Sequence, residues 1–301
     1  MTMSDVGKDP ESFPLIMNFW DSTPQLSHIH VRAESLLISP WALLAATLAN
    51  AASHIPPQIT APDGGTMNLL VGITGRPGSG FSTTIRASEE LVRPLGKISG
   101  IPTLKFCLEE LWSGGQRYDF PSASLTLDNA LGLPQLFHRQ GTSARRRTLD
   151  LLDGNRIPLP NGEVFDKGAY RVNLRESLYP GHNAKWLFEE NQRADHVAER
   201  YLIAPLWVRR PVPLAPTTLA PELPDWSLAP DGAVRAASGF VDPEDPGLPL
   251  RNRVSVALAS LHGQTEVDEH FWELADAPVR ISAWVSSEMS GSQRSATTSD
   301  S

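Results

Sequence analysis

Short apolar runs alternate with segments of helical periodicity through the middle of the chain. The apolar runs are MNLLVGITG (67–75), SLTLD (124–128), YRVNLR (170–175) and RYLIAPLW (200–207). Helical patterns lie between them at 82–95, 104–112, 129–138, 142–152 and 184–198. Strands that alternate with helices predict a parallel sheet covered by helices, which is an α/β fold.

Helical patterns also flank this core. Ser39 is a good N-cap with Pro40 at the first helical position, and an earlier helix is expected through 28–37. Near the C-terminus, a helix should end with Gly263 just beyond it, and Asp268 should cap the next one. The stretch between core and C-terminal helices is rich in proline and is typical of an extended linker.

These patterns predict the following organisation: an N-terminal helical region (1–65), an α/β core (66–207), a proline-rich linker (208–248), a C-terminal helical region (249–287) and a disordered tail (288–301). We find no internal repeat.

A glycine-rich loop follows the first predicted strand. Its sequence, Gly75-Arg-Pro-Gly78-Ser-Gly80-Phe81-Ser82-Thr83, fits G-x-x-x-x-G-K-[ST] except that Phe81 occupies the lysine position. Such a loop turns backbone N–H groups and a helix N-terminus toward a phosphate, and the hydroxyl of Ser82 would bind Mg²⁺. The alternative is a plain glycine-rich turn between a strand and a helix.

Asp128 ends the apolar run SLTLD, where a carboxylate could hold Mg²⁺ near the phosphates. The residue after it is Asn129, although a glutamate at this position would orient the attacking water. Asp followed by Asn before a helical pattern also suits a helix N-cap. Both roles remain open for Asp128.

The composition narrows the class of protein. The formal net charge is −8, so strong autonomous binding to nucleic acid is not expected, and any DNA contact should come from a local patch or be shared with a partner. Arg145, Arg146 and Arg147 form such a patch or a solvated helix face. The single cysteine, Cys107, excludes an internal disulfide and is expected to be buried. Without a signal sequence or an apolar run long enough to span a bilayer, a cytoplasmic protein is expected.

The chain resembles the RecA-like ATP-binding proteins of actinobacterial phages, plasmids and integrated elements, which are related to helicase and primase-helicase domains. The resemblance is carried by five segments: 19–57, 67–84, 126–160, 170–207 and 251–282. It implies a RecA-like P-loop core, with ATP and Mg²⁺ as cofactors. It further implies homo- or hetero-oligomerisation and a role in replicating a mobile element, with DNA or a replication protein as partner.

The resemblance also assigns site residues. Gly75, Gly80, Ser82 and Asp128 correspond to nucleotide-site positions, and Gly78 and Thr83 lie in the same loop. Arg200, before Tyr201, corresponds to an arginine finger that would act across a subunit boundary.

Phe81 and Asn129 depart from the family pattern, and both replace groups that act on the γ-phosphate. Three hypotheses follow. The protein could be a regulatory or structural subunit with weak or no hydrolysis. It could be an active ATPase or helicase in which Arg76, Arg86 or a partner residue replaces the lysine. It could instead be a protein-interaction scaffold that binds no nucleotide.

Overall fold

The computed structural model describes residues 18–61, 65–99, 104–118, 120–128, 141–159, 161–179, 187–188, 197–206, 223 and 248–297. One sheet contains the strands β1 (Leu70–Thr74), β2 (Lys97–Ser99), β3 (Ser122–Leu127), β6 (Arg171–Leu178) and β7 (Tyr201–Pro205). Their order is β2-β3-β6-β1-β7, and each neighbouring pair is parallel. All strands therefore end at the same edge of the sheet, which brings residues from distant parts of the sequence together.

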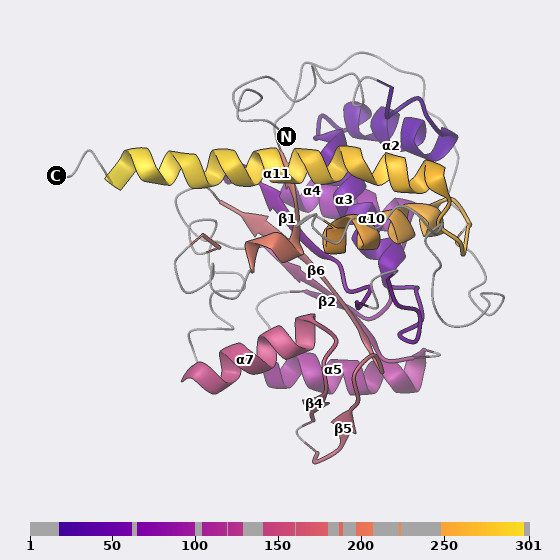
Figure 1. Cartoon of the computed structure of the whole chain (residues 1–301), viewed down its shortest axis with the longest axis vertical. Helices are drawn as coiled ribbons and strands as arrows, with labels where there is room; N and C mark the ends of the chain where they lie inside the picture. Colours follow the sequence, from indigo (N-terminus) through magenta and orange to yellow (C-terminus); the bar gives the residue numbers. More distant parts are fainter. Residues whose placement is uncertain are drawn as a thin grey trace.

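Helices pack around this sheet. They are α2 (Pro24–Ser35), α3 (Pro40–Ala52), α4 (Phe81–Leu91), α5 (Leu104–Arg117), α7 (Gly141–Leu152), α10 (Leu248–Leu261) and α11 (Glu269–Thr297). A 3-10 turn, η3 (Ala198–Arg200), precedes β7, and a separate hairpin joins β4 (Ile157–Pro158) to β5 (Val164–Phe165). Figure 1 shows α2, α3, α10 and α11 gathered toward one end of the molecule, with α5, α7 and the hairpin at the other. The predicted α/β fold, a parallel sheet flanked by N-terminal and C-terminal helices, is confirmed.

Helix α3 is the centre of the helical layer. Ser39 caps it by accepting from the Ala42 N–H, and Pro40 occupies the first turn, as the sequence predicted. All of its residues from Trp41 to Ala52 are buried, because α3 contacts α2, α4 and α10 as well as β1, β6 and β7. A helix that is largely apolar around its circumference is typical of such a buried position.

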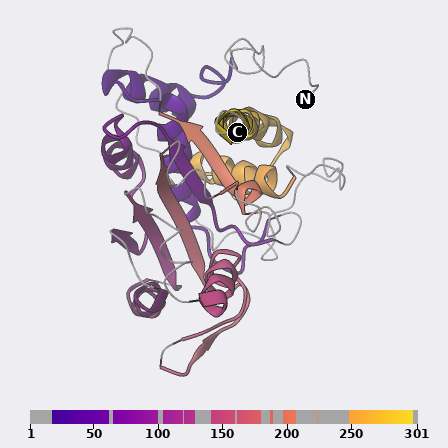
Figure 2. The ribbon, with the colours of Figure 1, turned by 90° about the vertical axis from the view of Figure 1, so that its left-hand side faces the viewer.

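Helix α11 packs along β7, the last strand at one edge of the sheet. The Ser282 hydroxyl accepts from the Ile203 N–H at 2.7 Å and donates to the Tyr201 carbonyl at 3.2 Å. In Figure 2, α11 (yellow) is seen end-on beside the strand coloured for β7. The helix therefore satisfies edge groups that would otherwise be open to pairing with another strand.

On strands β3 and β6, the sheet face that carries Arg175 is polar, although it is buried. Alternate residues of two neighbouring strands share this face: Ser122, Ser124 and Thr126 on β3, and Arg171, Asn173, Arg175 and Ser177 on β6. The apolar positions of both strands face the other way. Buried parallel strands usually form continuous apolar runs, so this polar layer is a distinctive feature of the fold.

Two arginines of the polar layer bind α3 and the segment after it to the sheet. Arg171 donates to the carbonyls of Ile55, Pro56 and Ile59, directly after α3. Arg175 donates to the Asn50 side chain on α3 and to the Thr126 hydroxyl on β3. Burial lowers the pKa of Arg171 to about 9 and that of Arg175 to about 10, so both guanidinium groups stay charged near neutral pH.

Gly72 lets a side chain cross β1 on the sheet surface. The Tyr201 hydroxyl, from β7, donates to the buried Glu176 carboxylate on β6 at 3.1 Å, although β1 lies between these strands. A Cβ at Gly72 would lie 2.3 Å from Leu178 Cδ1 and 3.3 Å from the Tyr201 ring. Glycine at this position therefore leaves room for both Leu178 and the crossing Tyr201 ring.

We expect Gly72→Ala to lower the free energy of unfolding by about 1–3 kcal/mol, because the methyl group overpacks Leu178 and the Tyr201 ring. Urea denaturation followed by circular dichroism measures the change. Tyr201→Phe in the Gly72→Ala background is the control: since the ring remains, it should not rescue stability. A Gly72→Ala variant as stable as the original protein would contradict the packing argument.

His262 joins the C-terminal helices to α2 as a neutral imidazole. Its Nδ1 lies 2.7 Å from the Leu258 carbonyl and must donate to it, so Nε2 accepts from the Thr23 hydroxyl at 2.8 Å. Thr23 also accepts from the Leu26 N–H as the N-cap of α2. Burial is the largest effect on the pKa of His262 and lowers it. The hydrogen bond to the Leu258 carbonyl raises this pKa, and the nearby His270 lowers it further.

Because its folded-state pKa lies below 6.5, His262 binds its proton less readily in the folded than in the unfolded chain. The contribution of His262 to the free energy of unfolding is therefore fully present above pH 6.5, and it should fall as the pH drops through the lowered pKa. His28 and His54 have lowered pKa values as well and act in the same direction. We expect His262→Gln to flatten part of this dependence in thermal melts from pH 8 to pH 5. An unchanged slope would contradict a contribution of His262 to the pH dependence of stability.

Several predicted elements differ in length from those observed. Helix α4 begins at Phe81 and ends at Leu91, and α5 runs on to Arg117. Gly263 has φ 74° beyond α10, and Asp268 accepts from the Phe271 N–H, as predicted. Helix α11 continues through 288–297, where the sequence predicted a disordered tail. The predicted helix at 129–138 lies outside the described residues. Most of the predicted helix at 184–198 and most of the predicted linker at 208–248 lie outside them too.

Candidate nucleotide and metal site

The carboxyl edge of the sheet carries the candidate site. The glycine loop follows β1, Asp128 follows β3 and Tyr179 follows β6, the strand between them. Ligands of open parallel α/β sheets bind in this position, beyond the carboxyl ends of the strands.

The glycine loop is a tight turn followed by a helix start. The Ser79 N–H donates to the Arg76 carbonyl at 3.0 Å, Pro77 occupies the second position of this turn, and Gly78 has φ 82°. These are the features of a type II turn, which requires a residue such as glycine at the third position. Gly80 also has a positive φ, 104°, and a Cβ there would lie 3.3 Å from Ile38. Gly78 and Gly80 thus determine the path of the loop into α4.

The N-terminus of α4 offers hydrogen-bond donors to an anion. Gly80 is its N-cap and supplies no side-chain acceptor to the first turn. The first helical N–H groups, of Phe81, Ser82 and Thr83, have no intrahelical partner. The partial positive charge of the helix end adds to the attraction for a phosphate.

Ser82 and Asp128 meet at this helix end. The Ser82 hydroxyl donates to Asp128 Oδ2 at 2.8 Å, and both side chains are exposed. Two oxygens on adjacent corners of an octahedral Mg²⁺ site with bonds of 2.0–2.1 Å are about 2.9 Å apart. The pair therefore has a spacing that fits a shared Mg²⁺ ion. The helix-cap role of Asp128 concerns 129–138, outside the described residues.

Tyr179 is a further member of the site that sequence reasoning missed. Its hydroxyl donates to Asp128 Oδ1 at 3.3 Å, so both carboxylate oxygens have a hydrogen-bond donor. Burial raises the pKa of Tyr179, Ser177 lowers it and Asp128 raises it. Its place directly after β6 was the available signal, because this strand lies beside both site strands.

Phe81 does not take the place of a lysine in the site. Its side chain is 5% exposed and belongs to the hydrophobic core beneath α4. Arg76 and Arg86, which could have supplied the missing charge, are both exposed. Since a phenyl ring offers neither charge nor donor, phosphate binding here would rest on the backbone N–H groups and a metal ion.

Arg200 is not brought together with these residues. It precedes β7 at the amino edge of the sheet, and it donates to both carboxylate oxygens of Asp153. From there to the carboxyl edge, β1 alone rises about 13 Å. An action of Arg200 on the site of a neighbouring subunit stays a prediction.

Other features of the chain do not extend this site. Among the described residues, no group of three or more His, Cys, Asp or Glu side chains could hold a metal. Cys107 is buried as predicted, and burial raises the pKa of its thiol to about 12. The side chains of Arg146 and Arg147 are exposed on α7.

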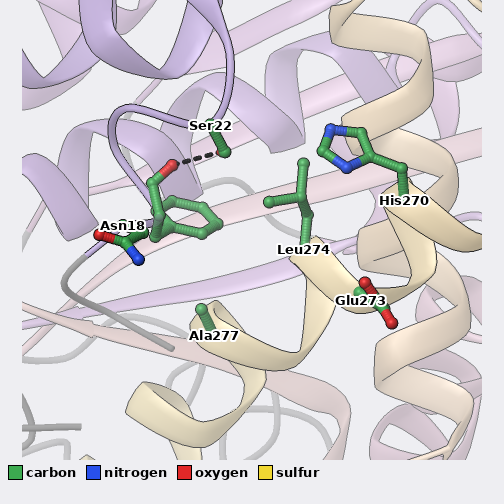
Figure 3. A pocket seen from close by; sticks show the side chains of 7 residues that line it. Asn18, Ser22, His270, Glu273, Leu274 and Ala277 are labelled. Carbon is green, nitrogen blue, oxygen red and sulfur yellow. Dashed lines mark hydrogen bonds between the residues drawn. The ribbon is translucent and has the colours of Figure 1, made fainter. Parts of the chain in front are cut away.

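A separate pocket of about 400 Å³ lies between the N-terminal turn and α11. Figure 3 shows Leu274 of α11 directed toward the turn that carries Asn18 and Ser22, with His270 and Glu273 on the same helix. It shares no lining residue with the glycine loop.

Fold and site together define the class of the protein: an α/β protein with a five-stranded parallel sheet, in which a glycine-rich loop follows β1 and a buried phenylalanine begins α4. No family model matches the chain, and no curated protein matches it. Among solved structures, a full-length MCM homolog from Methanopyrus kandleri is similar at 13% identity and a TM-score of 0.45. The alignment covers 93% of this chain and 62% of that one, so the chain spans less than two thirds of that protein. A similarity of this degree does not assign a family.

The structure also bears on membrane association. In the part of the chain that it describes, no helix has the length and apolar character needed to cross a bilayer.

Proposed function

We propose that the protein binds ATP and Mg²⁺ at the carboxyl edge of its sheet and hydrolyses ATP weakly or not at all. The observation that carries this proposal is the hydrogen bond of 2.8 Å between Ser82 and Asp128 beside the open N-terminus of α4. The backbone N–H groups of the loop would hold the phosphates, and Ser82 with Asp128 would hold the metal. Gly75, Gly78, Gly80 and Thr83 would complete the loop.

The buried ring of Phe81 supports the second part of the proposal. In P-loop NTPases the lysine neutralises charge that develops on the β- and γ-phosphates, so its loss should affect the chemical step more than ground-state binding. We therefore propose a regulatory or structural subunit of an oligomer that serves DNA replication of a mobile element in the cytoplasm. Arg200 is the candidate contact to a neighbouring subunit's nucleotide.

The competing functions differ in what they predict. An active ATPase would need Arg76, Arg86 or a partner residue at the phosphates, and would turn over ATP with Mg²⁺. A scaffold would bind no nucleotide. Equilibrium binding of ATP and ADP, with and without Mg²⁺, together with a turnover assay, separates the three possibilities.

We expect Mg²⁺ to increase the affinity for ATP, and we expect Asp128→Asn to remove that increase, because the variant loses the metal-binding carboxylate. Isothermal titration calorimetry in Mg²⁺ and in EDTA measures the difference. Asp166→Asn, at an exposed carboxylate paired with Arg156, is the matched control and should bind like the unaltered protein. No ATP binding under either condition would refute the nucleotide site, and turnover that Asp128→Asn abolishes would refute the weak-hydrolysis proposal.

Phe81→Lys should increase ATP affinity, because it restores a positive charge to the loop. It should also lower the free energy of unfolding by about 3 kcal/mol, since the ring leaves the core. Phe81→Leu is the control, because it changes the packing without adding a charge. If Phe81→Lys binds ATP no better than Phe81→Leu does, the loop is not a phosphate site.

A further inference from the structure

Arg175 belongs to the polar layer and lies on β6, the strand that ends at the candidate site. It is 1% exposed, and its guanidinium contacts three elements that surround the site. It donates to Thr126 Oγ1 of β3 at 2.7 Å and to Asn50 of α3, and it lies 3.3 Å from Glu89 Oε1 of α4. Each contact is made to a side chain rather than to the backbone, so the arginine joins separate elements.

Two of the residues that Arg175 contacts share a face of their strand or helix with a site residue. Thr126 is two residues before Asp128, and residues two apart share a face of a strand. Glu89 is two helical turns after Ser82, and residues seven apart share a face of a helix. Strand β3 and helix α4 are therefore joined twice: by Arg175 within the core, and by the Ser82–Asp128 hydrogen bond at the edge.

Further contacts support the Arg175 end of α4, away from the candidate site. Lys97 of β2 lies 2.6 Å from Glu89 Oε2, and Asn50 donates to Ser88 of α4 at 3.1 Å. Arg175 thus belongs to a network that fixes the second half of α4 against the sheet. With that half fixed, the first turn of α4 has little freedom to move away from β3.

We propose that Arg175 is a positioning residue that sets the separation of Ser82 and Asp128, and through it the divalent-cation affinity of the site. The metal part of this inference rests on the proposed function, whereas the spacing part does not. Lysine should not replace it, because a single ammonium group cannot bind Thr126, Asn50 and Glu89 in the planar geometry of a guanidinium.

Arg171 provides a matched control for Arg175. It lies on the same strand and the same face and is equally buried, at 1% exposure. Its hydrogen bonds go to the backbone after α3 and to Thr66, not to α4 or β3. Replacing either arginine should destabilise the fold, but only Arg175 should affect the spacing of the two site residues.

The first experiment measures spacing without any ligand. Ser82→Cys and Asp128→Cys are combined in the full chain, and oxidation of the pair is followed over time in a glutathione redox buffer. A disulfide requires the Cα atoms to approach within about 7 Å, so its rate of formation reports the separation. The buried Cys107, with its raised pKa, should not compete.

Arg175→Met and Arg175→Lys should slow this oxidation, and Arg171→Met should not, at a temperature where circular dichroism shows all variants folded. Equal rates in the Arg175 and Arg171 variants would overturn the proposal. Failure of the pair to oxidise in the otherwise unaltered chain would overturn it too, because the close spacing would be absent.

The second experiment measures ADP affinity in Mn²⁺ and in EDTA. Loss of a residue that orients a metal ligand typically weakens metal binding by about 10- to 100-fold. We expect a loss of this size in the Mn²⁺-dependent part of ADP affinity for Arg175→Lys, and none for Arg171→Lys. Equal losses in both variants would overturn the positioning role. If the unaltered protein binds no ADP, the proposed function fails, and the oxidation rates alone decide the role of Arg175.

Discussion

Two buried guanidinium groups on the central strand β6 join helices α3 and α4 to this sheet. Removing arginine from water costs several kcal/mol per ion, which only well-placed acceptors can offset. Arg171 obtains them from carbonyls after α3, and Arg175 from Asn50, Thr126 and Glu89. The positions of α3, α4 and β3 are therefore coupled, and a shift of one would leave a buried charge without its acceptors.

This coupling reaches the candidate site because the parallel sheet brings all strand ends to one edge. The glycine loop, Asp128 and Tyr179 come from segments that are far apart in sequence, yet they follow β1, β3 and β6. Helix α4 has its first turn at that edge and its second half in the polar network. The same helix thus carries the N–H groups that we propose bind a phosphate, and it contacts the core arginine.

Phe81, at the position that lysine holds in the pattern G-x-x-x-x-G-K-[ST], fits this architecture. The ring contributes to the core under α4 and brings neither a charge nor a hydrogen-bond donor to the loop. Backbone N–H groups bind a phosphate in its ground state but supply no mobile positive charge for the transition state. Under the proposed function, an arrangement with the loop, the hydroxyl and the carboxylate but without the lysine would favour binding over hydrolysis.

The sequence by itself determined four of the five strands of the main sheet, the Ser39, Asp268 and Gly263 helix ends, and the glycine loop, because these depend on local propensity and short-range hydrogen bonds. It missed the short strand β2 (Lys97–Ser99) and the hairpin of β4 and β5. It also proposed Ser82 and Asp128 as partners. Only the tertiary structure decided that their oxygens meet, that Tyr179 joins them, that Phe81 is buried and that Arg200 is paired with Asp153. The polar layer of β3 and β6 also needed the structure: alternation shows that polar residues share a face, but not that α3 covers it. Such contacts depend on strand order and packing, which no local pattern specifies.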